Sequence, residues 1–318
     1  MFSKLVLDSG TLDPSNVHEC RTLYTGRNGK SIVRFTMRHA DGSYIFKPLT
    51  NPETMGRELW VQTHLLPRIP VSVPRIVASA NPVDPERYWL IFEDAGPLQH
   101  ALREEEVIEA CATMPLWHQL DAELVPEHFT GDKPDSTAIG SVLTANWERL
   151  SSLLTQSGLE PASVEWLRNI VCSPKTVHGE EQVICHGDLH RGNIAFRQGK
   201  LILLDWEHVH RNHAFWDLYH VLDMTHPLFR RTITPQLRTS ALTAYLEQRM
   251  AMGWEAPVDS FIRDYHRYAA IHSAWMMLLI QADLEKESWP PADLLAAKEE
   301  TITSLADCLR YLMETSEV

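Results

Sequence analysis

The sequence has few cysteines that could form disulfide bonds and no long apolar run that could anchor it in a membrane. Its 318 residues include only five cysteines, an odd number spread widely along the chain with no Cys-x-x-Cys pair, so we expect no disulfide framework. The N-terminus lacks the basic and long apolar regions of a signal peptide. The most apolar run, residues 274–280, is too short to cross a bilayer. We therefore expect a cytoplasmic protein with no membrane insertion.

Positive charge is also scarce. The sequence has 29 Lys and Arg residues and 42 Asp and Glu residues, which gives a formal net charge of −13 with no basic patch to offset it. Because nucleic-acid binding needs clustered Lys and Arg, we expect no nucleic-acid partner. An acidic surface is compatible with a cationic substrate, although many soluble proteins are acidic for solubility alone. The length and the 44% hydrophobic content allow two domains with sizeable cores.

What the chain does have is a polar motif between residues 183 and 209. Asp188 follows His186 by two residues, and Asn193 follows Asp188 by five. This is the H-x-D-x-x-x-x-N spacing of the catalytic loop in phosphoryl transfer of the kinase type. The motif therefore indicates kinase chemistry.

The segment after Asn193 is predicted to be a β-hairpin. Short apolar runs at 194–196 and 201–204 flank Gln198-Gly199, a pair that suits a tight turn with positive φ. Because the outer ends of a hairpin lie side by side, Asn193 and Asp205 should meet. Their amide and carboxylate oxygens are hard ligands of the kind that Mg²⁺ prefers. The sequence predicts a magnesium site there, with Asp188 facing it from the preceding loop.

Two stretches resemble the aminoglycoside phosphotransferase family, the small-molecule relatives of the protein kinases. His186–Ile194 (HGDLHRGNI) matches the family's H-G-D-x-H-x-G-N loop, and Leu204–Glu207 (LDWE) matches its I/L-D-W/F-E/D metal-binding segment. The resemblance implies that Asp188 is the catalytic base and that Asn193 and Asp205 bind Mg²⁺. It also implies ATP as the phosphoryl donor and a small-molecule hydroxyl as the acceptor, on an aminoglycoside-, choline- or amino-alcohol-like substrate.

The same residues allow other interpretations. A metal-dependent phosphoesterase would use G-N-H-D/E, but Ile194 follows Asn193 here, and no upstream D-x-H lies on a strand. A catalytically inactive kinase-like binding protein stays open as an alternative. His208, His210 and His213 are interpreted as scattered surface histidines, because no cysteine stands near them with zinc-ligand spacing.

The N-terminal part is predicted to form a small lobe of antiparallel strands. Residues 20–24, 32–38 and 44–47 are β-prone, and residues 40–43 are expected to form a hairpin turn. Lys47 ends the third strand, where kinases place the lysine that pairs with the α and β phosphates. Its position before a predicted helix that bears a carboxylate favours this role over that of a solvated lysine at the edge of the sheet.

A helix from about residue 52 to residue 66 is expected to follow, with Asn51 as N-cap and Pro52 at its first position. Glu58 on this helix is the predicted partner that orients Lys47, with Glu53 as the alternative. We expect the pair to be accessible to solvent, and such pairs are worth only about 0–1 kcal/mol.

Two more strands are predicted at 73–77 and 88–92, and Glu93 and Asp94 follow directly. This stretch resembles the interlobe hinge of the family, whose main-chain groups hydrogen-bond adenine, and it is also compatible with a plain linker. Gly29-Lys30-Ser31 does not form a P-loop, because Tyr24 occupies the position of the first glycine. Residues 25–31 are therefore either a turn that covers the nucleotide or an ordinary hairpin.

The rest of the chain is predicted to be mainly helical. Asp217 resembles a family aspartate that supports the catalytic loop, and His118 is expected to be a packed histidine. We expect an α+β, protein-kinase-like fold, with residues 1–94 as the nucleotide-binding lobe and residues 95–318 as a helical lobe with the catalytic loop and substrate site. The predicted helices are 104–120, 137–156, 161–171, 215–224, 235–252, 258–284 and 291–313.

Overall fold

The structure is a computed structural model that describes residues 2, 5–26, 28–38, 40–81, 84–130, 134–172, 182–255, 257–287 and 289–315. The chain divides into two compact units. The first comprises Met1–His100, Glu127–Gly131 and Asn193–Val209, and the second comprises Ala101–Pro126, Asp132–Gly192 and His210–Val318. The segment 193–209 thus groups with the N-terminal unit although it is far from it in sequence. The functional division after residue 94 stays a prediction.

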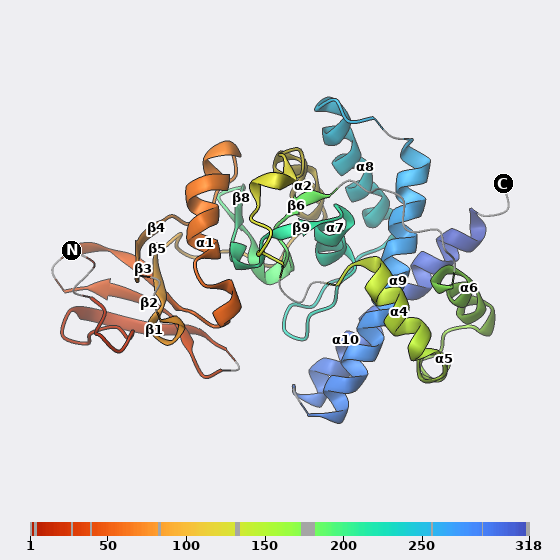
Figure 1. Cartoon of the computed structure of the whole chain (residues 1–318), viewed down its shortest axis with the longest axis horizontal. Coiled ribbons are helices and arrows are strands. Elements are labelled where there is room, and N and C mark those ends of the chain that lie inside the picture. The colour runs from red at the N-terminus through yellow and green to blue at the C-terminus, as the bar shows by residue number, and fades with distance from the viewer. Residues whose placement is uncertain are drawn as a thin grey trace. The chain divides into compact units, whose positions relative to one another are not determined.

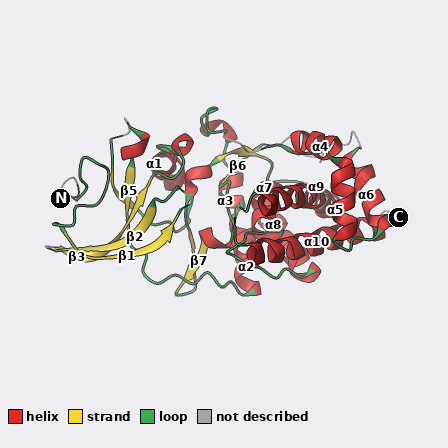
Figure 2. Cartoon of the chain, turned by 90° about the horizontal axis from the view of Figure 1, so that it is seen from below, coloured by secondary structure: helices red, strands yellow, loops and turns green. Residues whose placement is uncertain are grey.

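The first unit is built on a five-stranded antiparallel sheet in the order β1-β2-β3-β5-β4 (Figures 1 and 2). Its strands are β1 (Val17–Thr25), β2 (Ser31–Met37), β3 (Ala40–Pro48), β4 (Ile76–Ser79) and β5 (Trp89–Glu93). All five predicted strands are present. The turn expected at residues 40–43 is wrong, because these residues already belong to β3 and Ser43 pairs with Thr36. A register shift beside Thr36 and the φ of 112° at Gly42 move the reversal to an earlier point.

Both faces of strand β5 are covered. Because side chains alternate along a strand, Trp89 and Ile91 of β5 join one buried cluster, while Leu90 and Phe92 join another. Only Glu93 of β5 is exposed. The strand next to β3 is therefore fixed from both sides, which gives Lys47 on β3 a rigid frame.

The single helix expected at residues 52–66 is wrong in its first part. Asn51 caps as predicted, since its side chain accepts from the Glu53 amide, but only a 3₁₀ turn of Pro52–Thr54 follows. Gly56, with φ of 80°, interrupts the expected helix. Helix α1 (Arg57–Trp60) begins after it and continues into a π turn at Val61–Leu65. Glycine adopts this left-handed conformation without steric penalty. Glu58 consequently lies in the first turn of α1.

The predicted hairpin is confirmed as β7 (Ile194–Arg197) and β8 (Lys200–Leu203). Gln198 and Gly199 have φ of 52° and 74°, as a two-residue hairpin turn with the twist of the strands requires. Phe196 exchanges backbone hydrogen bonds of 2.9 and 3.1 Å with Gln99. The Leu203 amide also donates to the Ser72 carbonyl at 3.0 Å. These bonds join the hairpin to the N-terminal unit.

The second unit is mainly helical, with a two-stranded sheet of β6 (Val183–Cys185) and β9 (His210–Asn212) (Figure 1). Its longest helix, α9, packs against α10, α4, α5, α6, α7 and α8. Among the described residues, none of the helices has the length and apolar character that a membrane crossing needs. The helices are α2 (Glu104–Thr113), α3 (Pro115–His118), α4 (Ser136–Ala145), α5 (Trp147–Gln156), α6 (Pro161–Val171), α7 (Phe215–Leu222), α8 (Pro235–Ala251), α9 (Val258–Glu285) and α10 (Pro291–Glu314).

Two of the predicted helices are in fact broken. The helix expected at 104–120 divides at Met114, because Pro115 has no amide hydrogen to continue the helical ladder. The helix expected at 137–156 divides at Asn146, whose side chain donates back to the Val142 carbonyl at 2.8 Å. The other five predicted helices agree with the structure within a few residues.

Candidate active site

The first unit holds a buried charge cluster centred on Lys47. Its Nζ lies 2.6 Å from Asp205 Oδ1, 2.8 Å from Glu58 Oε2 and 3.0 Å from Glu207 Oε2. The predicted contact between Lys47 and Glu58 is therefore present. The expectation of an accessible pair is wrong, because the Lys47 side chain is only 9% exposed. Strand β3, helix α1 and the segment after the hairpin enclose it.

The charges of this cluster and its burial shift the pKa values of its members. Burial alone would lower the pKa of Lys47, but the carboxylates of Asp205, Glu207 and Glu58 raise it well above its usual value. Burial raises the pKa of Glu58 to about 7; Asp205 and Glu207 act in the same direction, and Lys47 opposes them. The carboxylates thus outnumber the ammonium in this cluster. Such a site favours the approach of a further cation.

The predicted metal ligands lie at the base of the hairpin. The Leu204 amide donates to the Asn193 carbonyl at 2.9 Å, so the two outer ends of the hairpin are held together. Asp205 has φ of 61° and ψ of 62°, a left-handed conformation that Asp tolerates better than most residues. Asn193 is buried, and the Asp205 side chain is 31% exposed.

Sequence reasoning assigned no role to Glu207. Its carboxylate oxygen lies within 4.8 Å of those of Glu58 and Asp205, and its side chain is 9% exposed. The sequence feature that could have indicated a role for Glu207 is its position in L-D-W-E, two residues after Asp205 on a short 3₁₀ turn. These three carboxylates offer oxygen donors and excess negative charge, and the ligand role of Asn193 stays a prediction. This donor set fits a magnesium ion.

Glu93 is the last residue of strand β5, and Asp94 follows it. The Asp94 carboxylate accepts from the Gly96 amide at 2.8 Å and lies 2.7 Å from Arg34 Nε, so it shapes the backbone at this point. Glu93 is exposed and pairs with Arg75 at 3.5 Å. The nucleotide-binding role of this segment stays a prediction.

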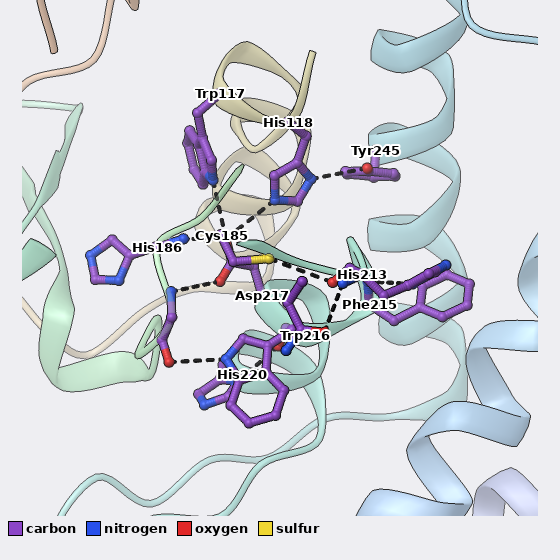
Figure 3. Close-up of polar contacts among 12 residues, drawn as sticks. Trp117, His118, Cys185, His186, His213, Phe215, Trp216, Asp217, His220 and Tyr245 are labelled. Carbon is purple, nitrogen blue, oxygen red and sulfur yellow. Dashed lines mark hydrogen bonds and ion pairs between the residues drawn. The ribbon is translucent and has the colours of Figure 1, made fainter. Parts of the chain in front are cut away.

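The second unit holds the start of the H-G-D loop with a buried carboxylate on α7. Asp217 accepts from the backbone amides of His186 at 2.8 Å and Gly187 at 3.1 Å (Figure 3). Trp117 Nε1 and His118 Nε2 contact the same carboxylate at 3.1 and 3.2 Å. Burial would raise the pKa of Asp217, but His118 and the backbone amide hold it well below its usual range. The backbone immediately before Asp188 therefore donates hydrogen bonds to the ionised carboxylate of Asp217.

Asp188 keeps its side chain 28% exposed. His190 follows with Nε2 at 3.6 Å from Asp188 Oδ2, while its Nδ1 accepts from the Gly192 amide at 2.9 Å. The His190 ring also stacks on His226 and Phe229, with centroid distances of 4.6 and 5.2 Å. A Cβ on Gly192 would lie only 2.5 Å from the Phe229 ring. The close stacking therefore requires glycine at this position.

The other histidines form no metal site in the described part of the chain. The groups of potential ligands found there are Glu58, Asp205 and Glu207 in the first unit, and His118, Cys185 and Asp217 in the second. His208, His210 and His213 belong to neither. The expectation that His210 is at the surface is wrong, because β9 pairs with β6 and buries it against Trp216.

A small antiparallel sheet with a buried lysine, and a helical unit with an aspartate-bearing H-G-D loop, together define the class of protein-kinase-like phosphotransferases. The family model described as "Phosphotransferase enzyme family" matches residues 24–271. The chain belongs to this family.

Solved structures share the fold at low sequence identity. Choline kinase from Cryptosporidium parvum Iowa II has a TM-score of 0.60 at 14% identity, and 99% of this chain and 95% of that chain are covered. Macrolide 2′-phosphotransferase MphH from Brachybacterium faecium has a TM-score of 0.58 at 15% identity, with 92% and 93% covered. The streptomycin–ATP complex of APH(2″)-IIa has a TM-score of 0.55 at 13% identity, with 92% and 94% covered. The comparison with curated proteins gave no match.

Proposed function

We propose that the protein is an ATP-dependent small-molecule kinase that transfers the γ-phosphoryl group to an alcohol. The observation that carries this proposal is the buried Lys47 among Glu58, Asp205 and Glu207, in a chain that also has the H-G-D loop. Family membership supports it. So does the relative whose solved complex contains streptomycin and ATP.

The residues of the first unit bind and neutralise the nucleotide in this proposal. Lys47 pairs with the α and β phosphates, Glu58 orients Lys47, and the backbone at Glu93 and Asp94 binds adenine. Asn193 and Asp205 would hold Mg²⁺, which supplies charge neutralisation at the β and γ phosphates when bound. Lys47 then exchanges part of its carboxylate contact for phosphate oxygens.

Asp188 orients the acceptor hydroxyl and takes its proton. A positioned base of this kind contributes about 10²–10⁴-fold to the rate. Because the transition state is loose, positioning and charge neutralisation supply most of the remaining acceleration, and no covalent enzyme intermediate is needed. The acceptor is an aminoglycoside-, choline- or amino-alcohol-like molecule, and the net charge of −13 is compatible with a cationic one.

The test is an ATP-consumption screen over aminoglycosides, macrolides, choline and other amino alcohols, with mass spectrometry of the products. Acceptor-dependent ADP formation and a mass gain of one phosphoryl group, both absent from Asp188→Asn, would support the proposal. Nucleotide binding with no turnover of any acceptor would instead indicate an inactive kinase-like binding protein. Phosphate release from a generic ester without ATP would indicate a phosphoesterase.

A further inference from the structure

A chain of buried hydrogen bonds leads from helix α8 to the catalytic loop. The Tyr245 hydroxyl lies 3.0 Å from His118 Nδ1, and His118 Nε2 lies 3.2 Å from Asp217 Oδ2 (Figure 3). Tyr245 is 1% exposed, His118 is 2% exposed and Asp217 is fully buried. Tyr245 and His118 are 127 residues apart in the sequence, so only the fold brings them together.

The direction of each hydrogen bond follows from the chemistry of the groups. An ionised carboxylate can only accept, so His118 must carry a hydrogen on Nε2. In a neutral imidazole the other nitrogen is then an acceptor, and the Tyr245 hydroxyl becomes its donor. The Asp217 carboxylate thus fixes the hydrogen on Nε2, and the Tyr245 hydroxyl, hydrogen-bonded to Nδ1 at 3.0 Å, holds the ring of His118 in the orientation that donates to Asp217.

A change in the orientation of His118 would disturb the loop. Without the Tyr245 hydroxyl the His118 ring can turn, so that Nε2–H no longer points at the Asp217 carboxylate. Asp217 would then shift away from the His186 and Gly187 amides that it accepts from at 2.8 and 3.1 Å. Asp188 is the next residue in the chain.

We propose that Tyr245 is a positioning residue, which fixes His118 and through it the contact of Asp217 with the catalytic-loop backbone. Its effect on catalysis rests on the proposed function. The relay, by which we mean the chain of hydrogen bonds from Tyr245 through His118 to Asp217, is independent of the proposed function, because it can be measured on the ligand-free protein.

The chain offers a matched pair of substitutions. Tyr245→Phe removes only the hydroxyl. Tyr268→Phe does the same at a tyrosine that is also 1% exposed and whose hydroxyl has no hydrogen-bond partner among the residues described. Both tyrosines lie in the second unit. A general effect of losing a buried hydroxyl should appear in both variants, and a relay effect only in the first.

Hydrogen–deuterium exchange of peptides covering residues 183–190 is the direct test. Tyr245→Phe should speed exchange of these amides about two- to tenfold, the range that one neutral hydrogen bond is worth. Tyr268→Phe should exchange like the parent, and neither variant should change exchange in β1 or β2. Equal exchange of residues 183–190 in the two variants would overturn the proposal.

A double-mutant cycle tests the route. His118→Gln can place an amide N–H near the former Nε2 position, but it has no counterpart of Nδ1. In that background Tyr245→Phe should add nothing to the exchange of residues 183–190, because the two residues act through one contact. A full additional effect would show that Tyr245 acts by another path and would overturn the relay.

Kinetics with an acceptor found in the screen complete the test. Tyr245→Phe should lower kcat about two- to tenfold and leave the KM for ATP nearly unchanged, since the nucleotide contacts lie in the first unit. An unchanged kcat would overturn the catalytic part of the proposal. If no acceptor supports turnover by the parent, the proposed function fails, and the exchange result still decides the relay.

Discussion

The ammonium of Lys47 lies 2.6 Å from the carboxylate of Asp205, a residue 158 positions further along the chain. The lysine predicted to bind phosphate is thus held by the carboxylate predicted to bind metal. Glu58 and Glu207 complete the same cluster, so three carboxylates surround one ammonium group.

Lys47→Met should lower the free energy of unfolding by about 3–5 kcal/mol at neutral pH, because it leaves buried carboxylates without their common counter-ion. Urea unfolding measures the change. Lys30→Met is the control, since Lys30 pairs with the exposed Glu86 at 3.1 Å and should change stability by no more than about 1 kcal/mol. ATP should also raise the melting temperature of Lys47→Met less than that of the parent. Parent-like stability and ATP protection would remove Lys47 from the site.

Glu58→Gln should change how stability depends on pH. The pKa of Glu58 is raised to about 7 in the folded protein, above its ordinary 4.5. Between these values the folded state keeps a proton that the unfolded state has lost, so this contribution to stability falls as pH rises from about 4.5 to 7. The variant should therefore show a flatter profile in that window, measured by urea unfolding in metal-free buffer. Glu109→Gln, on the exposed side of α2, should keep the parental slope, and an unchanged slope in Glu58→Gln would contradict the assignment.

Asp205→Ala should weaken Mg²⁺-dependent ATP binding more than Asn193→Ala, because it removes an anionic ligand and the other change removes a neutral one. Without Mg²⁺ the two substitutions should rank differently in their effect on ATP affinity. There Asp205→Ala should not weaken ATP binding, since the loss of one carboxylate leaves Lys47 more available to phosphate. Calorimetric titrations with and without the metal measure both effects, and identical binding by parent and variants in Mg²⁺ would rule out these ligands.

Asp188→Asn should keep the affinity for Mg²⁺ and ATP nearly unchanged while turnover falls by at least about 10²-fold. The variant loses the proton acceptor and leaves the cluster around Lys47 intact. Both quantities are to be measured on the same preparation. Retained turnover would exclude Asp188 as the base.

Gly192→Ala should lower both activity and stability. Its Cβ would lie 2.5 Å from the Phe229 ring and 2.6 Å from the His190 ring, so the stacked loop must shift, at about 1–3 kcal/mol. Gly140→Ala is the control, because a Cβ there meets nothing within 4 Å inside α4 and should stabilise the helix by about 0.5–1 kcal/mol. Thermal melts and turnover on an identified acceptor measure the two effects. Normal turnover by Gly192→Ala would show that the packing of His190 does not position Asp188.

The local parts of the site follow from short stretches of sequence. The turn at Gln198-Gly199 closes a short hairpin, and a hairpin joins its ends whatever surrounds it, so the pairing of the segments next to Asn193 and Asp205 could be read from spacing alone. Helix α6 begins at Pro161 as expected, because proline fits the first helical turn. Such features depend on neighbours in sequence.

The burial of the site residues and their long-range partners depend on how distant elements pack together. Lys47 was expected in an accessible pair, but packing encloses it and adds Glu207 as a further carboxylate. The hydrogen-bonded contact between His118 and Tyr245 likewise joins α3 to α8. Helical periodicity shows that a residue lies on a buried face, and it does not show which polar group lies opposite. That group is fixed by how the elements pack, since a buried polar atom must find its partner wherever the fold supplies one.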